Sequence, residues 1–267
     1  MKSLLATLVL SGLLAACGDS SAQGGGSEGG SEPGGGNEGG GSTVDPVCTD
    51  PTEVACEDDV ILQMNLKADP TTTGITSDAD GSGFLSVVDA TAGGAFNADP
   101  DSYTYGKFTD AGLEQVQISD EEAITSMEWD IAFRRYVGRI NSGNSGPSCV
   151  TAARLPGTPD YDATTSVPDD LTFRTDTYFT ESCELIADGT GLENSPATAL
   201  SSYWTYPGCV QMTGNVFILE LASGRHVKLT VTHFYTEAAQ EQCQTQGTVP
   251  MTNTGSGTIQ VRWAFLP

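Results

Sequence analysis

The sequence has few histidines and few basic residues. Its 267 residues include 2 histidines, His226 and His233, and 11 lysines and arginines, against 35 aspartates and glutamates. A metal site built from several imidazoles is therefore excluded, as structural and catalytic zinc sites commonly need them. The formal net charge of −24 repels phosphate backbones, so we expect no nucleic-acid partner.

Recognisable catalytic motifs are also scarce. The sequence has no CxxC pair and no glycine-rich phosphate-binding loop that ends in lysine. Ser145 lies in a protease-like setting, but no histidine precedes it, and Pro147 stands where the elbow of a hydrolase needs glycine. We interpret Ser145 as a turn residue and expect a protein that is not an enzyme. A hydrolase that uses carboxylates is a weaker hypothesis, which rests only on the abundance of acidic residues.

The N-terminal segment is typical of an export signal. Lys2 precedes an apolar run over residues 4–16, which is too short to span a bilayer permanently. Leu14-Ala15-Ala16-Cys17 then resembles the lipobox of bacterial lipoproteins. This resemblance implies a signal peptide over 1–16 and acylation, including palmitate, at Cys17. The alternative is an ordinary secretory peptide with a coincidental cysteine.

Residues 17–43 predict a disordered tether. Eleven of the eighteen residues in 24–41 are glycine, and such a segment cannot bury a core. We expect it to hold a folded domain, residues 44–267, away from the membrane. The predicted location is an outer-membrane lipid anchor, on the cell surface or the periplasmic face, with contact to the membrane through the lipid alone.

The remaining cysteines agree with an oxidising compartment. Six cysteines follow the lipidation site, and an even number predicts three disulfides with fifteen possible pairings. They are Cys48, Cys56, Cys149, Cys183, Cys209 and Cys243. Because Cys48 and Cys56 close a short loop, we expect these two to pair.

The folded part predicts an all-β, single antiparallel domain stapled by disulfides. Short runs rich in β-branched and aromatic residues alternate with turn signals. The expected strands are 59–66, 83–90, 102–108, 113–118, 127–133, 171–179, 215–222, 226–235 and 258–266. Short helices are expected at 119–124, where Ser119 and Glu122 form a capping-box pattern, and at 236–243.

The strongest hairpin signal joins 215–222 to 226–235 through Ser223-Gly224. Strict alternation in its second strand places His226 and His233 on opposite faces, with His233 on the apolar one. Two histidines on opposite faces of one strand cannot easily be ligands of the same iron. A core histidine is the simpler interpretation of His233.

An acidic segment has the spacing of a calcium loop. Counted from Asp78, oxygen-bearing residues occupy positions 1, 3, 5 and 12 of an EF-hand-like pattern. They are Asp78, Asp80, Ser82 and Asp89. A calcium-stabilised binding or structural module is thus our alternative function, although the segment also predicts a strand and an acidic turn.

One stretch resembles a known family. Residues Trp129 to Tyr136 and Arg139 to Gly146 resemble the WD-x-A-x-x-R-Y and R-x-N-x-G-x-S-G signature of the HmuY family. Similarity to the family's strands extends the resemblance over about residues 84–267. Trp129, Ile131 and Phe133 would alternate onto one core face, and Asp130 would bond a backbone amide or an arginine. The adjacent Arg134 and Arg135 predict a bulge.

The resemblance implies a haem-binding lipoprotein. The best-known members of the family hold haem between axial side chains and pass it to an outer-membrane haem receptor. The family's haem histidines lie between the signature and the late hairpin, but residues 137–225 contain none here. The remaining candidates for iron ligands are Met212, His233, Tyr206 and Tyr203.

The basic residues are concentrated around the same signature. Haem propionates need cations, so the candidates for binding them are Arg134, Arg135 and Arg139. These arginines could instead neutralise nearby acids. The leading hypothesis is a non-enzymatic protein that binds haem or a related tetrapyrrole.

Overall fold

The fold was analysed in a computed structural model. It describes residues 47–72, 74–91, 102–192 and 195–267. These residues belong to one compact unit, Thr43–Pro267. The predicted signal peptide, the acylated Cys17 and the tether lie outside the described residues. None of the helices in the described ranges is long and apolar enough to cross a membrane.

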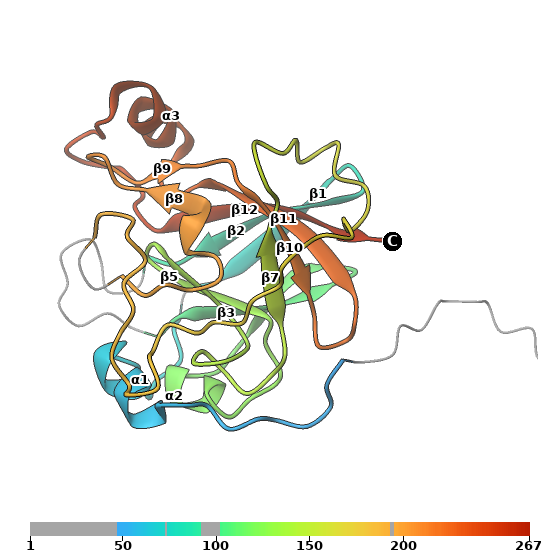
Figure 1. The fold of residues 1–267 in the computed structure, drawn as a ribbon. Coiled ribbons are helices and arrows are strands. Elements are labelled where there is room, and N and C mark those ends of the chain that lie inside the picture. Colours follow the sequence, from blue (N-terminus) through green and yellow to red (C-terminus); the bar gives the residue numbers. More distant parts are fainter. Residues whose placement is uncertain (1–46, 73, 92–101, 193–194) are drawn as a thin grey trace, which may run out of the picture. The chain divides into compact units, whose positions relative to one another are not determined.

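A six-stranded antiparallel sheet forms the larger layer (Figure 1). Its strands, in spatial order, are β1 (Ile75–Asp80), β2 (Gly83–Asp89), β12 (Thr258–Leu266), β11 (His226–His233), β10 (Val216–Glu220) and β7 (Thr151–Arg154). The β10–β11 hairpin pairs Glu220 with His226 and turns through Gly224, whose φ of 78° suits glycine. The hairpin expected from the sequence is therefore confirmed.

A four-stranded antiparallel sheet forms the second layer. Its spatial order is β4 (Gly112–Val116), β3 (Thr104–Thr109), β5 (Ile131–Arg134) and β6 (Val137–Ile140). A separate short hairpin joins β8 (Trp204–Thr205) to β9 (Gln211–Met212), after the 3₁₀ turn η1 (Ser201–Tyr203). The expected all-β fold is confirmed by these antiparallel sheets and their three disulfides.

Aromatic rings fill the main core. Trp263 of β12 stacks on Phe84 at 4.8 Å between ring centroids and meets Phe108 of β3 edge-on, also at 4.8 Å. Residues of both sheets therefore share one apolar cluster, as burial of their inner faces requires.

Three α-helices lie among the described residues. They are α1 (Glu57–Gln63), α2 (Asp120–Ala123) and α3 (Glu237–Gln246). The capping box of α2 is confirmed, because Ser119 accepts from the Glu122 amide while the Glu122 side chain accepts from the Ser119 amide. In Figure 1, α3 lies with β8 and β9, and α1 lies with α2 at the other end of the sheets.

Two expected strands are absent from the described residues. The segment 59–66 lies largely in α1, where Val60 and Met64 are buried four residues apart while Leu62 is 77% exposed. This is helical spacing, and three acidic residues in the first turn favour a helix start. The segment 171–179 makes only isolated bridges, such as Ala152 to Arg174, because no neighbouring strand extends the ladder.

Two expectations for the signature's strand are also corrected. Ile131 and Phe133 pack in the main core, but Trp129 precedes β5 and packs in a second cluster near Tyr105, 4.9 Å between ring centroids. Arg135 is part of a tight turn instead of a bulge. Its φ is 54°, and Arg134 pairs with Val137 across that turn.

The disulfides join distant parts of the chain, so the expected Cys48–Cys56 pair is wrong. The bonds are Cys48–Cys149, Cys56–Cys183 and Cys209–Cys243. The physical reason is that residues 47–56 run along the rest of the domain. The amide of Thr52 donates to the carbonyl of Pro147 at 2.8 Å, close to Cys149.

Candidate functional site

The family signature builds a buried polar network. Arg139 is fully buried, and its Nε and Nη2 donate to Oγ and the carbonyl of Ser145 at 3.1 and 2.8 Å. Ser145 Oγ in turn donates to Asp176 Oδ2 at 2.6 Å. Asp130 accepts from the Phe108 amide at 2.9 Å, which confirms the expected backbone bond. Ser145 is thus a buried structural residue in a turn.

Burial perturbs the acids of this network. It raises the pKa of Asp176 and the pKa of Asp130 to about 6 each, opposed by their hydrogen bonds. Asp176 also accepts from the amides of Ile140 and Ala199, at 2.9 and 2.7 Å. These carboxylates hold loops together, and their burial keeps them from any ligand.

Two of the three predicted propionate arginines are engaged inside the protein. Arg134 Nη1 lies 3.3 Å from Asp120 Oδ2, and its guanidinium also donates to the carbonyls of Met64 and Asn65. Arg139 is held by the network described above. Arg135 is half-buried, and its Nη1 donates to the Ser256 carbonyl at 2.7 Å.

The four predicted iron ligands differ in their accessibility. Tyr203 is 1% exposed, and its hydroxyl donates to the Tyr136 carbonyl at 2.7 Å. Burial raises the pKa of Tyr203 well above its usual value, so its phenol stays protonated. Tyr206 is 40% exposed, whereas Met212 and His233 are half-buried.

Met212 and His233 lie near opposite ends of α3. The backbone of Met212 is bonded to the side chain of Gln244, with its amide donating at 2.7 Å. Glu237 lies close enough to His233 to raise the pKa of that imidazole, although burial outweighs this effect and lowers it. Seven residues of helix separate Glu237 from Gln244, which is about 10 Å. Met212 and His233 thus lie beside different turns of α3.

The strand of His233 also departs from strict alternation. Its pairing register with β12 shifts between Val231 and His233, which marks a β-bulge. His233 Nδ1 lies 3.0 Å from Thr232 Oγ1, and its ring is half-buried. The expected placement of His233 on the buried face therefore does not hold.

The predicted calcium residues lie along a β-hairpin. Asp78 pairs with Leu85 and Asp80 pairs with Gly83, so the segment 78–89 forms two strands instead of a closed loop. Asp80 is bonded to Arg262, and Asp89 to Thr91. The described residues contain no group of three potential metal-ligating side chains, and the structure gives calcium no support.

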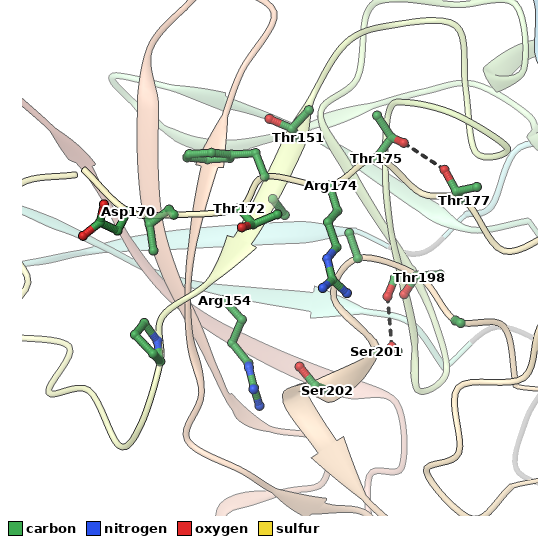
Figure 2. A pocket seen from close by; sticks show the side chains of 16 residues that line it. Thr151, Arg154, Asp170, Thr172, Arg174, Thr175, Thr177, Thr198, Ser201 and Ser202 are labelled. Atoms are coloured by element: carbon green, nitrogen blue, oxygen red, sulfur yellow. Dashed lines mark hydrogen bonds between the residues drawn. The ribbon is translucent and has the colours of Figure 1, made fainter. Parts of the chain in front are cut away.

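A cavity of about 920 Å³ lies elsewhere among the described residues (Figure 2). Its lining comes from β7, the segment 170–177 and the segment 197–202, and includes Arg154 and Arg174. The lining contains none of the four predicted iron ligands. Neither arginine was expected at a site, because both lie outside the clusters of basic residues in the sequence. Their isolation from other cations was the one signal in the sequence that pointed to them.

Comparison with known proteins identifies the family. The sequence profile of the HmuY family, described as HmuY protein, matches residues 82–246. The chain therefore belongs to the HmuY family. No curated protein matches the chain significantly.

Several solved structures match the chain at low sequence identity. A candidate lipoprotein from Bacteroides fragilis matches with 14% identity and a TM-score of 0.45 over 71% of this chain and 93% of its own. A candidate HmuY-like heme-binding protein from Bacteroides vulgatus matches with 15% identity and a TM-score of 0.44 over 71% and 96%. An apo HmuY analogue from Tannerella forsythia matches with 15% identity and a TM-score of 0.38 over 74% and 99%.

Proposed function

We propose that this chain is a lipid-anchored, extracytoplasmic protein that binds haem or a related tetrapyrrole and has no enzymatic activity. The observation that carries the proposal is membership of the HmuY family over residues 82–246. The anchor at Cys17 and transfer to an outer-membrane haem receptor are parts of the same proposal, and both come from sequence resemblance.

The residues that fit haem best form a surface around Met212, which we define as the half-buried Met212, Tyr136 and Arg135, packed on the buried ring of Trp204. Met212 and Trp204 are directly opposite in the β8–β9 hairpin, so their side chains lie on one face. The Trp204 ring lies 5.0 Å from the half-buried ring of Tyr136. The surface therefore offers a thioether beside aromatic carbon.

Arg135 adds a cation to this surface. It immediately precedes Tyr136 in the β5–β6 turn. Its Nη1 donates to the Ser256 carbonyl, and its other terminal nitrogen takes no part in that bond. Bound haem would supply an iron centre that accepts a thioether ligand. In this proposal Met212 would be a ligand of the iron, and Arg135 would pair with a propionate.

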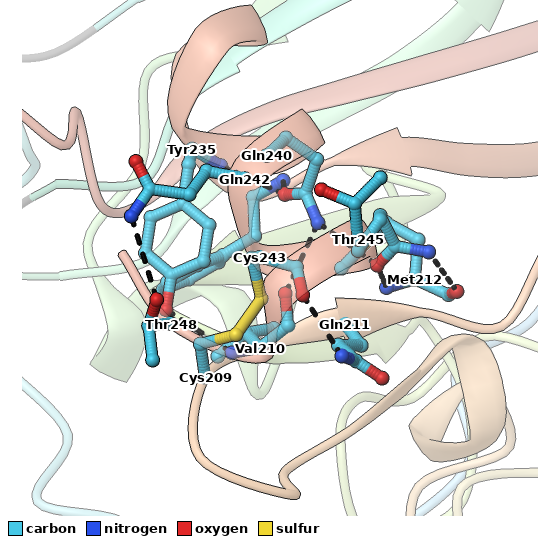
Figure 3. The surroundings of a disulfide bond; sticks show 12 residues. Cys209, Val210, Gln211, Met212, Tyr235, Gln240, Gln242, Cys243, Thr245 and Thr248 are labelled. Atoms are coloured by element: carbon cyan, nitrogen blue, oxygen red, sulfur yellow. Dashed lines mark hydrogen bonds between the residues drawn. A yellow bond between two sulfur atoms is a disulfide. The ribbon is translucent and has the colours of Figure 1, made fainter. Parts of the chain in front are cut away.

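The disulfide Cys209–Cys243 fixes the position of Met212. It ties the segment before β9 to α3, and Gln211 Nε2 donates to the Cys243 carbonyl at 2.9 Å (Figure 3). The strand β9 is therefore held in two ways, by the disulfide just before it and by the side chain of Gln211. Such support favours a ligand position that is formed before binding.

The test is a haemin titration of the purified full chain, followed at the Soret band. We expect a saturable shift that Met212→Leu changes in position and weakens, because leucine keeps the apolar volume but removes the sulfur. Met251→Leu is the matched control, since Met251 is fully exposed, at 102% of the reference area. The absence of a saturable shift in both redox states would overturn haem binding. A shift that depends on His233 and not on Met212 would overturn the ligand assignment.

A further inference from the structure

Two arginines of the 920 Å³ cavity differ from every other described cation. Ten basic residues fall in the described ranges, and eight of them have a side-chain partner, such as Asp110 for Arg225 and Glu128 for Lys107. Arg154 and Arg174 have no side-chain hydrogen bond, ion pair or ring contact to any described residue. Both line the same cavity, in a chain with 35 acidic residues.

The backbone holds these arginines in place. Arg174 exchanges two backbone hydrogen bonds of 2.9 Å with Ala152 of β7, and Arg154 of the same strand pairs with Phe217 of β10. In Figure 2 the side chains of Arg154 and Arg174 both extend toward the segment of Ser201 and Ser202. Both arginines are exposed, and their guanidinium groups present several N–H donors, which suits a carboxylate or a sulfate.

The cavity wall also offers unpaired hydroxyls. Thr172 is exposed and Ser202 half-buried, and the hydroxyls of both lack a partner within the described chain. Asp170, on the same wall, can accept from hydroxyl donors.

We propose that this cavity binds a small polyhydroxylated anion, namely a hexose that carries a carboxylate or a sulfate. Arg154 and Arg174 bind the anionic group, and the hydroxyls of Thr172 and Ser202 bind those of the sugar. The cavity volume lies within the usual range for small-molecule sites. The site contains no predicted iron ligand, so it is independent of the haem proposal.

The experiment is calorimetric titration of the purified full chain with glucuronate, glucose 6-sulfate and glucose. We expect one or both anionic sugars to bind at least about tenfold more tightly than glucose, which corresponds to about 1.4 kcal/mol. The tighter of the two identifies the anionic group. Equal binding of glucose, or no binding of either acidic sugar, would overturn the proposal.

Variants locate the site. Arg154→Ala and Arg174→Ala should each weaken binding of the anionic sugar by about tenfold or more, because each removes charge-assisted hydrogen bonds. Arg174→Lys should weaken it less than Arg174→Ala, since lysine keeps the charge but loses the fork of donors. Lys107→Ala is the control that matches the change in net charge, and its affinity should stay at the wild-type value. Undiminished binding in the double arginine variant would contradict the assignment, provided that its thermal melt stays at the wild-type temperature.

Discussion

The hydroxyl of Ser145 donates a 2.6 Å hydrogen bond to Oδ2 of Asp176, and this bond joins the family signature to the segment 171–179. Both side chains are fully buried. Asp176 also accepts from the amides of Ile140 and Ala199, so one carboxylate joins the end of β6, the turn that follows it and the segment around Ala199. The polar side chains of this stretch therefore hold the fold together.

Replacing this carboxylate should be costly. Asp176→Asn puts an amide NH₂ where the structure needs an acceptor, and an unsatisfied buried donor results. We expect the free energy of unfolding to fall by about 3 kcal/mol, as measured by urea denaturation. Asp169→Asn, at an exposed position of the same loop, is the control and should stay within about 0.5 kcal/mol of wild type. Equal stability of the two variants would refute the role of Asp176.

Asp130 should make stability depend on pH. Burial raises its pKa to about 6 from an ordinary 3.8, so the folded chain binds this proton more tightly than the unfolded chain does. Its stabilising effect is fully present below the unfolded pKa and is lost as pH rises through about 6. As the pH falls from 7 to 4, the free energy of unfolding of the wild type should therefore rise by up to about 3 kcal/mol relative to that of Asp130→Asn.

The comparison with Asp130→Asn isolates this single group. Relief of acidic repulsion and titration of Asp176 occur in both proteins and cancel in the difference. Asparagine can still accept from the Phe108 amide, so the variant should fold. A difference in unfolding free energy that stays constant between pH 4 and pH 7 would contradict a raised pKa at this carboxyl.

The parts of the fold that could be predicted from sequence depend on local signals. The β10–β11 hairpin follows from alternation and a glycine turn, and the α2 capping box follows from Ser119 and Glu122. The segment 59–66 was wrongly expected to be a strand, because its apolar residues also suit a strand. The exposure of Leu62, which fits a helix, is known only from the folded structure.

The candidate site was harder to predict because partners distant in sequence decide which side chains are available. Arg134 stands next to Arg135 in the sequence, yet Asp120 and two backbone carbonyls engage the first of them inside the protein. The free pair, Arg154 and Arg174, is brought together by the bridge between Ala152 and Arg174. No spacing along the chain indicates that bridge.

The disulfide pattern can be checked by peptide mapping. Digestion without reduction should yield peptides that link Cys48 to Cys149, Cys56 to Cys183 and Cys209 to Cys243. Replacing both Cys48 and Cys149 by serine should cost about 1 kcal/mol more than replacing Cys209 and Cys243, because the closed loop is longer. The sequence separations are 101 and 34 residues. A peptide that links Cys48 to Cys56 would refute the pairing.

Lipidation of Cys17 is tested by metabolic labelling. Cells that express the full chain should incorporate labelled palmitate into it, and the protein should sediment with membranes. Cys17→Ser removes the acceptor thiol, so the label should disappear and the anchor should be lost. Unchanged labelling of the variant would place the lipid elsewhere, and no labelling of wild type would contradict the anchor.

The most direct test of haem binding through Met212 is iron X-ray absorption on the haem-loaded full chain. The account predicts a sulfur scatterer in the first shell of iron, lost in Met212→Leu and retained in Met251→Leu. A first shell of nitrogen and oxygen alone in the wild-type protein would contradict it.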